Sequence, residues 1–142
     1  MIAKQIGMPR DRLSQITLGG LLHDVGKVLI PLDVLNKTGK LTDKEFDLIK
    51  SHPTLGYQML RSANVGNNLL AHHVVYQHHE RQDGKGYPRG LTGRNQIRRS
   101  RQASVDPKRI HIVGEISGVA DPYEALAADR PYQLAFPPEK VR

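Results

Sequence analysis

At 142 residues the chain is long enough for one hydrophobic core and too short for two ordinary domains, so we expect residues 1–142 to form a single domain. The absence of cysteine excludes disulfides and thiolate metal sites, so that any metal would need His, Asp and Glu ligands. No apolar run approaches the roughly 18 residues of a membrane span and no secretory signal is visible, so the sequence favours a cytoplasmic protein, and its net charge of +7 suits an anionic partner.

The first predicted helix begins near Asp11, which is a plausible N-cap. Apolar residues then recur mostly at steps of three and four, the spacing of a buried amphipathic helix; they are Leu13, Ile16, Leu18, Leu21, Leu22 and Val25. Pro31 ends this pattern, and the polar stretch NKTGKL that follows predicts a connecting loop.

The next helix start is marked by Thr42, which is followed three residues later by Glu45. A hydroxyl and a carboxylate at this spacing form a capping box, which predicts a helix over about 43–51. His52 directly precedes Pro53, and this position disfavours the helical backbone. We therefore expect His52 at the junction with the following helix.

Two further helices are predicted over about 54–62 and 67–79, and the last turn of the second carries His78 and His79. The segment DGKGYPRGLTGR at 83–94 contains too many glycines to be helical for long, and it predicts a loop.

After this loop the chain is strongly basic from Arg94 to Arg109, which favours a solvated loop over contact with nucleic acid. Helical spacing resumes over about 110–128, where Pro122 predicts a bend beside Asp121. Because no segment alternates like a strand, we expect an all-α fold.

Histidines and carboxylates form the pattern with the most chemical content. Neutral histidine is a common metal ligand, and carboxylates offset the charge of the ion. Neighbouring residues on a helix point about 100° apart, so adjacent ligands suit two ions, which can clamp a phosphate and activate a water. The candidate ligands are His23, Asp24, His52, His78, His79 and Asp121.

Four segments in order, LLHDVGK, SHPTLG, HHERQDGKGYP and VADPYEALAADRPY, resemble the motifs of the HD-GYP family, a branch of the HD phosphohydrolase superfamily. The resemblance implies an all-α, HD-domain helical bundle with a glycine-rich GYP loop. It also implies a metal-dependent phosphodiesterase that hydrolyses the bacterial second messenger cyclic di-GMP to linear pGpG or GMP. Two or three divalent ions, iron or manganese, would be its cofactors.

The same resemblance implies roles for individual residues. Asp24 would bridge two ions and be catalytic; His52, His78 and His79 would complete one coordination shell, and His23 and Asp121 would serve the other. The residues implied to contact substrate are Lys27, Tyr87 and Arg130, of which Lys27 would also support catalysis. Glu80 would orient a ligand histidine rather than bind metal itself.

Departures from the family pattern leave alternatives open. No histidine or glutamate precedes His23, where the family has a further ligand, and Glu124 and Gln133 replace an aspartate and a basic residue. We therefore expect a domain truncated at both ends. A catalytically impaired module that binds nucleotide or protein partners, or an HD hydrolase of another phosphoester, remains as an alternative.

The resemblance also bears on partners and on the remaining histidines. Receiver or GGDEF domains are the expected signalling partners, an oligomer fits the family, and no nucleic acid is expected because aromatic residues do not interleave with the basic segment. His72, His73 and His111 are interpreted as structural, since the family motif puts the ligand pair at 78 and 79.

Overall fold

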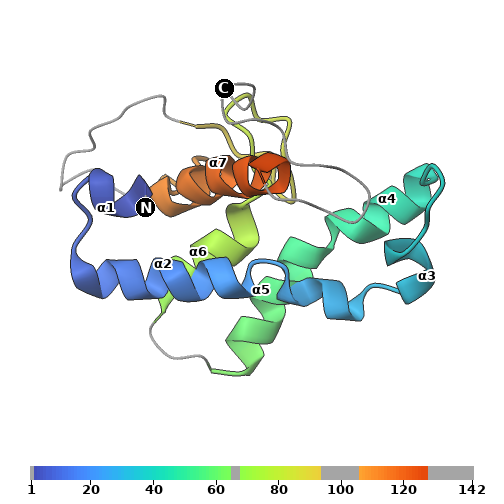
Figure 1. The fold of residues 1–142 in the computed structure, drawn as a ribbon, viewed down its shortest axis with the longest axis horizontal. Coiled ribbons are helices and arrows are strands. Elements are labelled where there is room, and N and C mark those ends of the chain that lie inside the picture. The colour runs from blue at the N-terminus through green and yellow to red at the C-terminus, as the bar shows by residue number, and fades with distance from the viewer. Residues whose placement is uncertain (1, 65–67, 94–105, 128–142) are drawn as a thin grey trace.

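A computed structural model describes residues 2–64, 68–93 and 106–127 (Figure 1). These residues form helices joined by loops, with isolated β-bridges at Thr92 and no strand, so the prediction of an all-α fold is confirmed. The elements are α1 (Ile2–Gln5), α2 (Arg10–Leu22), the 3-10 helix η1 (Val25–Leu29), α3 (Leu32–Leu35), α4 (Asp43–Lys50), α5 (His52–Ser62), α6 (Leu69–Gln77) and α7 (Ile112–Ala127).

Helix α6 lies at the centre of the bundle, where it packs against α2, α5 and α7 (Figure 1). Its side chains Ala71, Val74 and Val75 are almost completely buried, as is Val113 of α7. Helix α2 approaches α6 closely at Gly19, where an added Cβ would lie 2.7 Å from the Cβ of Val74. The buried face of α6 therefore fixes the positions of the histidines that follow its end.

A second close approach joins η1 to α5. A Cβ on Gly26 would collide with the carbonyl oxygen of His52 and would lie 2.6 Å from the backbone nitrogen of Gly56. Only glycine allows the backbones to come this close. The contact places Asp24, two residues before Gly26, beside the first turn of α5.

Helix α2 differs from its prediction at both ends. Its N-cap is Pro9, and Asp11 lies inside the first turn. Leu21 is 78% exposed, and Val25 already belongs to η1. A 3-10 helix repeats every three residues and an α-helix every 3.6, so a short apolar pattern runs through the junction without marking it.

The other predicted boundaries agree closely with the structure. The capping box of Thr42 and Glu45 begins α4 as predicted. Helix α5 begins at His52 rather than at residue 54, because a proline in the first turn needs no N–H partner. His78 and His79 directly follow the last residue of α6, and the N–H of His78 still bonds to the carbonyl of Val74.

Some expectations concern features that helical periodicity does not reveal. Helices α1 and α3 have four residues each and were not predicted, because one turn is too short to show a period. Pro122 lies inside α7 as expected. Among the described helices none is long and apolar enough to cross a membrane. Arg130, Gln133 and most of the basic segment lie outside the described residues.

Candidate metal centre

Four of the predicted ligands converge on one point. Asp24, His52, His78 and His79 each offer an atom, and these atoms all lie within 4.8 Å of one another. They come from the link between α2 and η1, the start of α5 and the end of α6. The described part of the fold thus gathers side chains that are 55 residues apart in sequence, counting from Asp24 to His79.

Three of the histidine rings are oriented in the same way, because each ring has its Nδ1 atom close to a backbone carbonyl three residues earlier. The Nδ1 to oxygen distances are 2.6 Å for His23 and Gly20, 2.7 Å for His52 and Ile49, and 3.0 Å for His78 and Val75. A carbonyl oxygen only accepts, so Nδ1 carries the hydrogen. In the neutral ring Nε2 is left with a lone pair, which is the form that binds metal.

The lone pairs point at one another. The Nε2 atoms of His52 and His78 are 3.2 Å apart, and Oδ1 of Asp24 lies 3.2 Å and 3.9 Å from them. Both histidines are at most 2% exposed, and Asp24 Oδ1 is buried without a hydrogen-bond partner. Three electron-rich atoms in a dry space repel one another unless a cation lies between them. The residues present therefore fit a divalent metal ion.

The protonation states agree with this fit. Burial, followed by repulsion from neighbouring histidines, lowers the pKa of His78 to about 3 and that of His79 to about 4. Burial alone would raise the pKa of Asp24, but hydrogen bonds from His23 and Lys27 outweigh it and hold the pKa well below its usual range. At neutral pH His78 and His79 are thus neutral imidazoles and Asp24 is a carboxylate, the forms that metal binding requires.

The second oxygen of Asp24 faces a different set of groups. Oδ2 accepts a hydrogen bond of 2.6 Å from Nζ of Lys27 and lies 3.4 Å from Nε2 of His23. The same His23 nitrogen is 3.6 Å from Oδ1 of Asp121 on α7. The hydrogen bond to Asp24 raises the pKa of His23 to about 8. Asp24 therefore separates a cluster of three histidines from a smaller group formed by His23, Lys27 and Asp121.

The loop after the histidines folds back over the cluster. The N–H of Tyr87 bonds to the carbonyl of His79 at 3.1 Å, and the two rings stack with centroids 4.7 Å apart. A Cβ on Gly86 would lie 2.5 Å from both the carbonyl oxygen of His79 and the Cα of Glu80. Glycine at position 86 is therefore what lets Tyr87 reach the candidate ligand His79.

The hydrogen bonds of Glu80 differ from the expectation that it orients a ligand histidine. Its buried carboxylate accepts the N–H of Arg89 at 2.7 Å through one oxygen and the N–H of Leu91 at 2.7 Å through the other. Charged acceptors make strong hydrogen bonds to backbone donors. Glu80 thus holds the loop, and its partners could not be predicted from side-chain patterns because they are backbone groups nine and eleven residues away.

The remaining histidines lie outside the cluster, as predicted. His73 stacks on His111 with ring centroids 4.4 Å apart, and His72 packs against the edge of Tyr57. These contacts join α6 to its neighbours. What the sequence reasoning missed is the close approach at Gly26, although a glycine three residues after a candidate ligand was a usable signal.

The helical bundle and its cluster define a class of protein: an α-helical domain whose histidines and aspartate can hold a metal ion. The family model described as HD domain matches residues 1–101, which is most of the chain. The chain belongs to the HD domain family.

Curated relatives match almost the whole chain. It is similar to a cyclic di-GMP phosphodiesterase of Pseudomonas aeruginosa, with 38% identity over 95% of this chain and 29% of the relative. A cyclic di-GMP phosphodiesterase response regulator of Xanthomonas campestris is 35% identical over 96% of this chain and 32% of the relative. A cyclic di-GMP phosphodiesterase of Thermotoga maritima is 37% identical over 99% of this chain and 34% of the relative.

The chain spans about a third of the length of these relatives. Their names are those expected from the HD-GYP resemblance, and the predicted family is confirmed.

Proposed function

We propose that residues 1–142 form one HD-GYP domain, the hydrolase part of a metal-dependent phosphodiesterase that acts on cyclic di-GMP. One observation carries the proposal: the Nε2 atoms of His52 and His78, two buried histidines whose Nδ1 atoms lie on backbone carbonyls, face the unpartnered Oδ1 of Asp24. The names of relatives that are 35% to 38% identical support the substrate. The expected products are linear pGpG, GMP or both.

The ligands divide into two sets that share Asp24. His52, His78, His79 and Oδ1 of Asp24 would hold one ion, because their donor atoms converge. His23, Asp121 and Oδ2 of Asp24 would hold a second, and Asp24 would bridge the pair. Bound iron or manganese ions would supply charge neutralisation at the phosphate and an activated water. A third ion would need ligands beyond these six.

Lys27 and Tyr87 are the described residues best placed to meet the phosphodiester. The ammonium of Lys27 lies at the edge of the cluster on Asp24 Oδ2, where it adds a positive charge for a phosphate oxygen. Burial raises the pKa of Tyr87 to about 12, so its hydroxyl stays protonated and can donate a hydrogen bond. Arg130 is assigned to substrate by the family motif alone.

A second candidate substrate is 3'3'-cGAMP. Three relatives of Vibrio cholerae named as 3'3'-cGAMP-specific phosphodiesterases are 31% to 34% identical to the chain over 93% to 99% of its length. Both dinucleotides present the same phosphodiester to the cluster, so the difference must arise from contacts to the bases. Identity is higher, at 35% to 38%, to the three cyclic di-GMP enzymes described above, and this makes cyclic di-GMP our first choice.

We propose that the domain works in the cytoplasm as part of a longer signalling protein. A receiver domain is the partner best supported, because one relative is named a response regulator. A GGDEF domain and self-association are further candidates.

The test is turnover of cyclic di-GMP and of 3'3'-cGAMP by anaerobically purified protein with added iron or manganese, with the products separated by chromatography. We expect metal-dependent cleavage that Asp24→Asn abolishes and that Asp33→Asn, a change of the exposed aspartate on α3, preserves. Binding of the dinucleotide without cleavage by the wild-type protein would instead identify a receptor module.

A further inference from the structure

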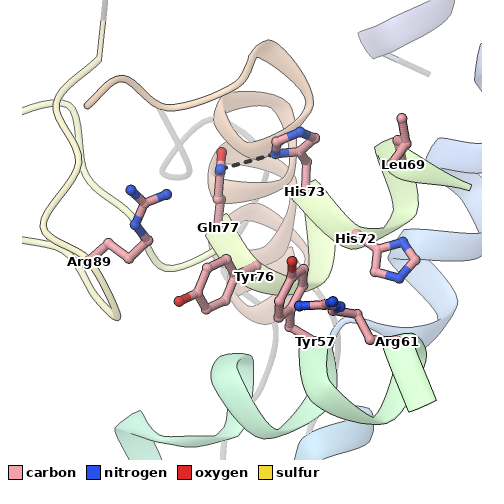
Figure 2. Close-up of a pocket in the computed structure, with 8 residues that line it drawn as sticks. All are labelled: Tyr57, Arg61, Leu69, His72, His73, Tyr76, Gln77 and Arg89. Atoms are coloured by element: carbon pink, nitrogen blue, oxygen red, sulfur yellow. Dashed lines mark hydrogen bonds between the residues drawn. The ribbon is translucent and has the colours of Figure 1, made fainter. Parts of the chain in front are cut away.

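A pocket lies along α5 and α6 and shares no residue with the candidate metal cluster. It has a volume of about 300 Å³, which is at the lower end for small-molecule sites. Figure 2 shows its lining, which comes from α5, α6 and the loop after His79. The lining residues are Tyr57, Arg61, Leu69, His72, His73, Tyr76, Gln77 and Arg89.

The charged residues that line this pocket are all positive. Arg61 and Arg89 both line it, and no acidic residue does. The ion pairs within the described residues include neither arginine. The guanidinium of Arg89 donates to the carbonyl of Pro107 at 2.9 Å, which fixes its direction and leaves other N–H groups available. Two guanidiniums without carboxylate partners favour an anion, and phosphate matches their planar fork.

The floor of the pocket is aromatic. Tyr57 and Tyr76 stack with centroids 4.6 Å apart, and the guanidinium of Arg61 lies 5.9 Å from the centroid of Tyr57. In Figure 2, Arg89 lies on the opposite side of the tyrosine pair from Arg61. Neither tyrosine hydroxyl has a hydrogen-bond partner among the described residues. A flat ring could extend this stack, since bases bind to aromatic faces without regard to sequence.

The remaining polar groups of the wall are already occupied. Gln77 donates to Nδ1 of His73 at 3.1 Å and accepts the N–H of His111 at 2.8 Å. These bonds make one wall rigid and leave recognition to the arginines and tyrosines. An anion, a planar ring and a small volume together describe a nucleotide. We propose that this pocket binds a nucleoside monophosphate, with its phosphate on the arginines and its base against the tyrosines.

Binding there would reach the metal cluster through the loop. Arg89 lies two residues after Tyr87, whose ring stacks on His79, and the carboxylate of Glu80 accepts the backbone N–H of Arg89 itself. A ligand that ties Arg89 to α5 therefore restrains the loop that carries Tyr87. Since GMP is a product of the proposed hydrolysis, such a site would let product act on the enzyme.

The experiment is calorimetric titration of the full chain with GMP in the presence of EDTA, which keeps the metal cluster out of the measurement. We expect saturable binding that Arg61→Gln and Arg89→Gln each weaken about tenfold or more, the effect of losing a charge-assisted phosphate contact. Tyr76→Leu should weaken it by a similar factor. Lys85→Gln removes an equal charge from the same loop outside the pocket and should leave affinity unchanged, as should Lys27→Met at the cluster.

Equal affinity of the two arginine variants and the wild-type protein would overturn the proposal. So would inorganic phosphate that binds as tightly as GMP, because it would show an anion site without a base. AMP that binds as tightly as GMP would support a site for nucleoside monophosphates and would show that the two tyrosines do not distinguish adenine from guanine. The result is independent of catalysis, because no metal is present: absent turnover refutes the proposed function alone, and absent GMP binding refutes the pocket alone.

Discussion

The Nε2 atoms of His52 and His78 face each other at 3.2 Å, although a backbone carbonyl holds the Nδ1 hydrogen of each ring. Neither ring can donate to the other in this arrangement. Two buried acceptors in contact, with a carboxylate oxygen at 3.2 Å from one of them, are unfavourable until a cation joins them. The fold therefore holds the two Nε2 atoms and the carboxylate oxygen in a mutually repulsive arrangement, and a bound metal ion would relieve this repulsion.

Metal binding should stabilise the protein measurably. An ion at one hundred times its dissociation constant adds about 2.7 kcal/mol to the free energy of unfolding, so manganese should raise the melting temperature above that in EDTA. His79→Ala should remove most of this rise, and His72→Ala, which changes a histidine of α6 outside the cluster, should keep it. Equal rises in the two variants would show that the cluster is not the binding site.

Gly26→Ala should separate the two halves of the cluster. The new methyl group would collide with the carbonyl oxygen of His52, so η1 must move from α5 at a cost of about 1–3 kcal/mol. Gly20→Ala is the matched control, because a Cβ there meets nothing within 4 Å and replaces glycine inside a helix. That variant should be neutral or more stable by about 0.5–1 kcal/mol. Urea unfolding measures both, and equal midpoints would contradict the close approach.

Local sequence patterns predict structure well where all the interacting groups lie close together in the chain. The capping box at Thr42 and Glu45 predicted the start of α4 correctly, because all its partners lie within three residues. The candidate ligands were named from the family motifs, and four of them converge in the structure. The orientation of their rings could not be predicted, because the carbonyls that fix the rings depend on where each helix ends.

Contacts between distant segments could not be read from the sequence. Glu80 resembled a partner of a histidine because it directly follows two of them, yet its oxygens bind the backbone of the loop. Leu21 fitted the apolar stripe and is exposed, because the chain leaves the α-helix one residue later. Both Leu21 and Glu80 lie at or just after the end of a helix, where periodicity no longer predicts contacts. The residues of the cluster also lie at helix ends and in the links between helices.

Glu80→Gln should loosen the loop. The amide presents one NH₂ group where the carboxylate presented an acceptor, so the N–H of Arg89 or of Leu91 loses its partner. The cost is about 1–3 kcal/mol, and hydrogen exchange at these two amides should accelerate while exchange in α6 changes little. Asp83→Asn alters an exposed carboxylate of the same loop and should leave both amides protected. Unchanged exchange in Glu80→Gln would mean that the loop is held by other contacts.

The capping box should contribute a pH-dependent part of the stability. Hydrogen bonds from Lys37 and Thr42 lower the pKa of Glu45 from 4.5 to about 2. A lowered folded pKa means that the contribution is complete above about pH 4.5 and is lost as the pH falls toward 2. Glu45→Gln should therefore lower the melting temperature at pH 7, and the difference should shrink on acidification and vanish near pH 2. A difference in melting temperature between Glu45→Gln and the wild-type protein that stays constant with pH would contradict the assignment.

Lys27→Met distinguishes a group that assists the reaction from one that holds the metal. The ammonium bonds to Asp24 Oδ2, on the side of the carboxylate opposite the three histidines, so its loss should leave the metal-dependent rise in melting temperature intact. Turnover of cyclic di-GMP should fall about 10²-fold, because a charge that stabilises the phosphate in the transition state is gone. Lys50→Met, which breaks an exposed ion pair with Asp47 on α4, should change neither quantity. If Lys27→Met also abolished the metal-dependent rise, Lys27 would instead act by positioning Asp24, and the loss of turnover would follow from an empty site.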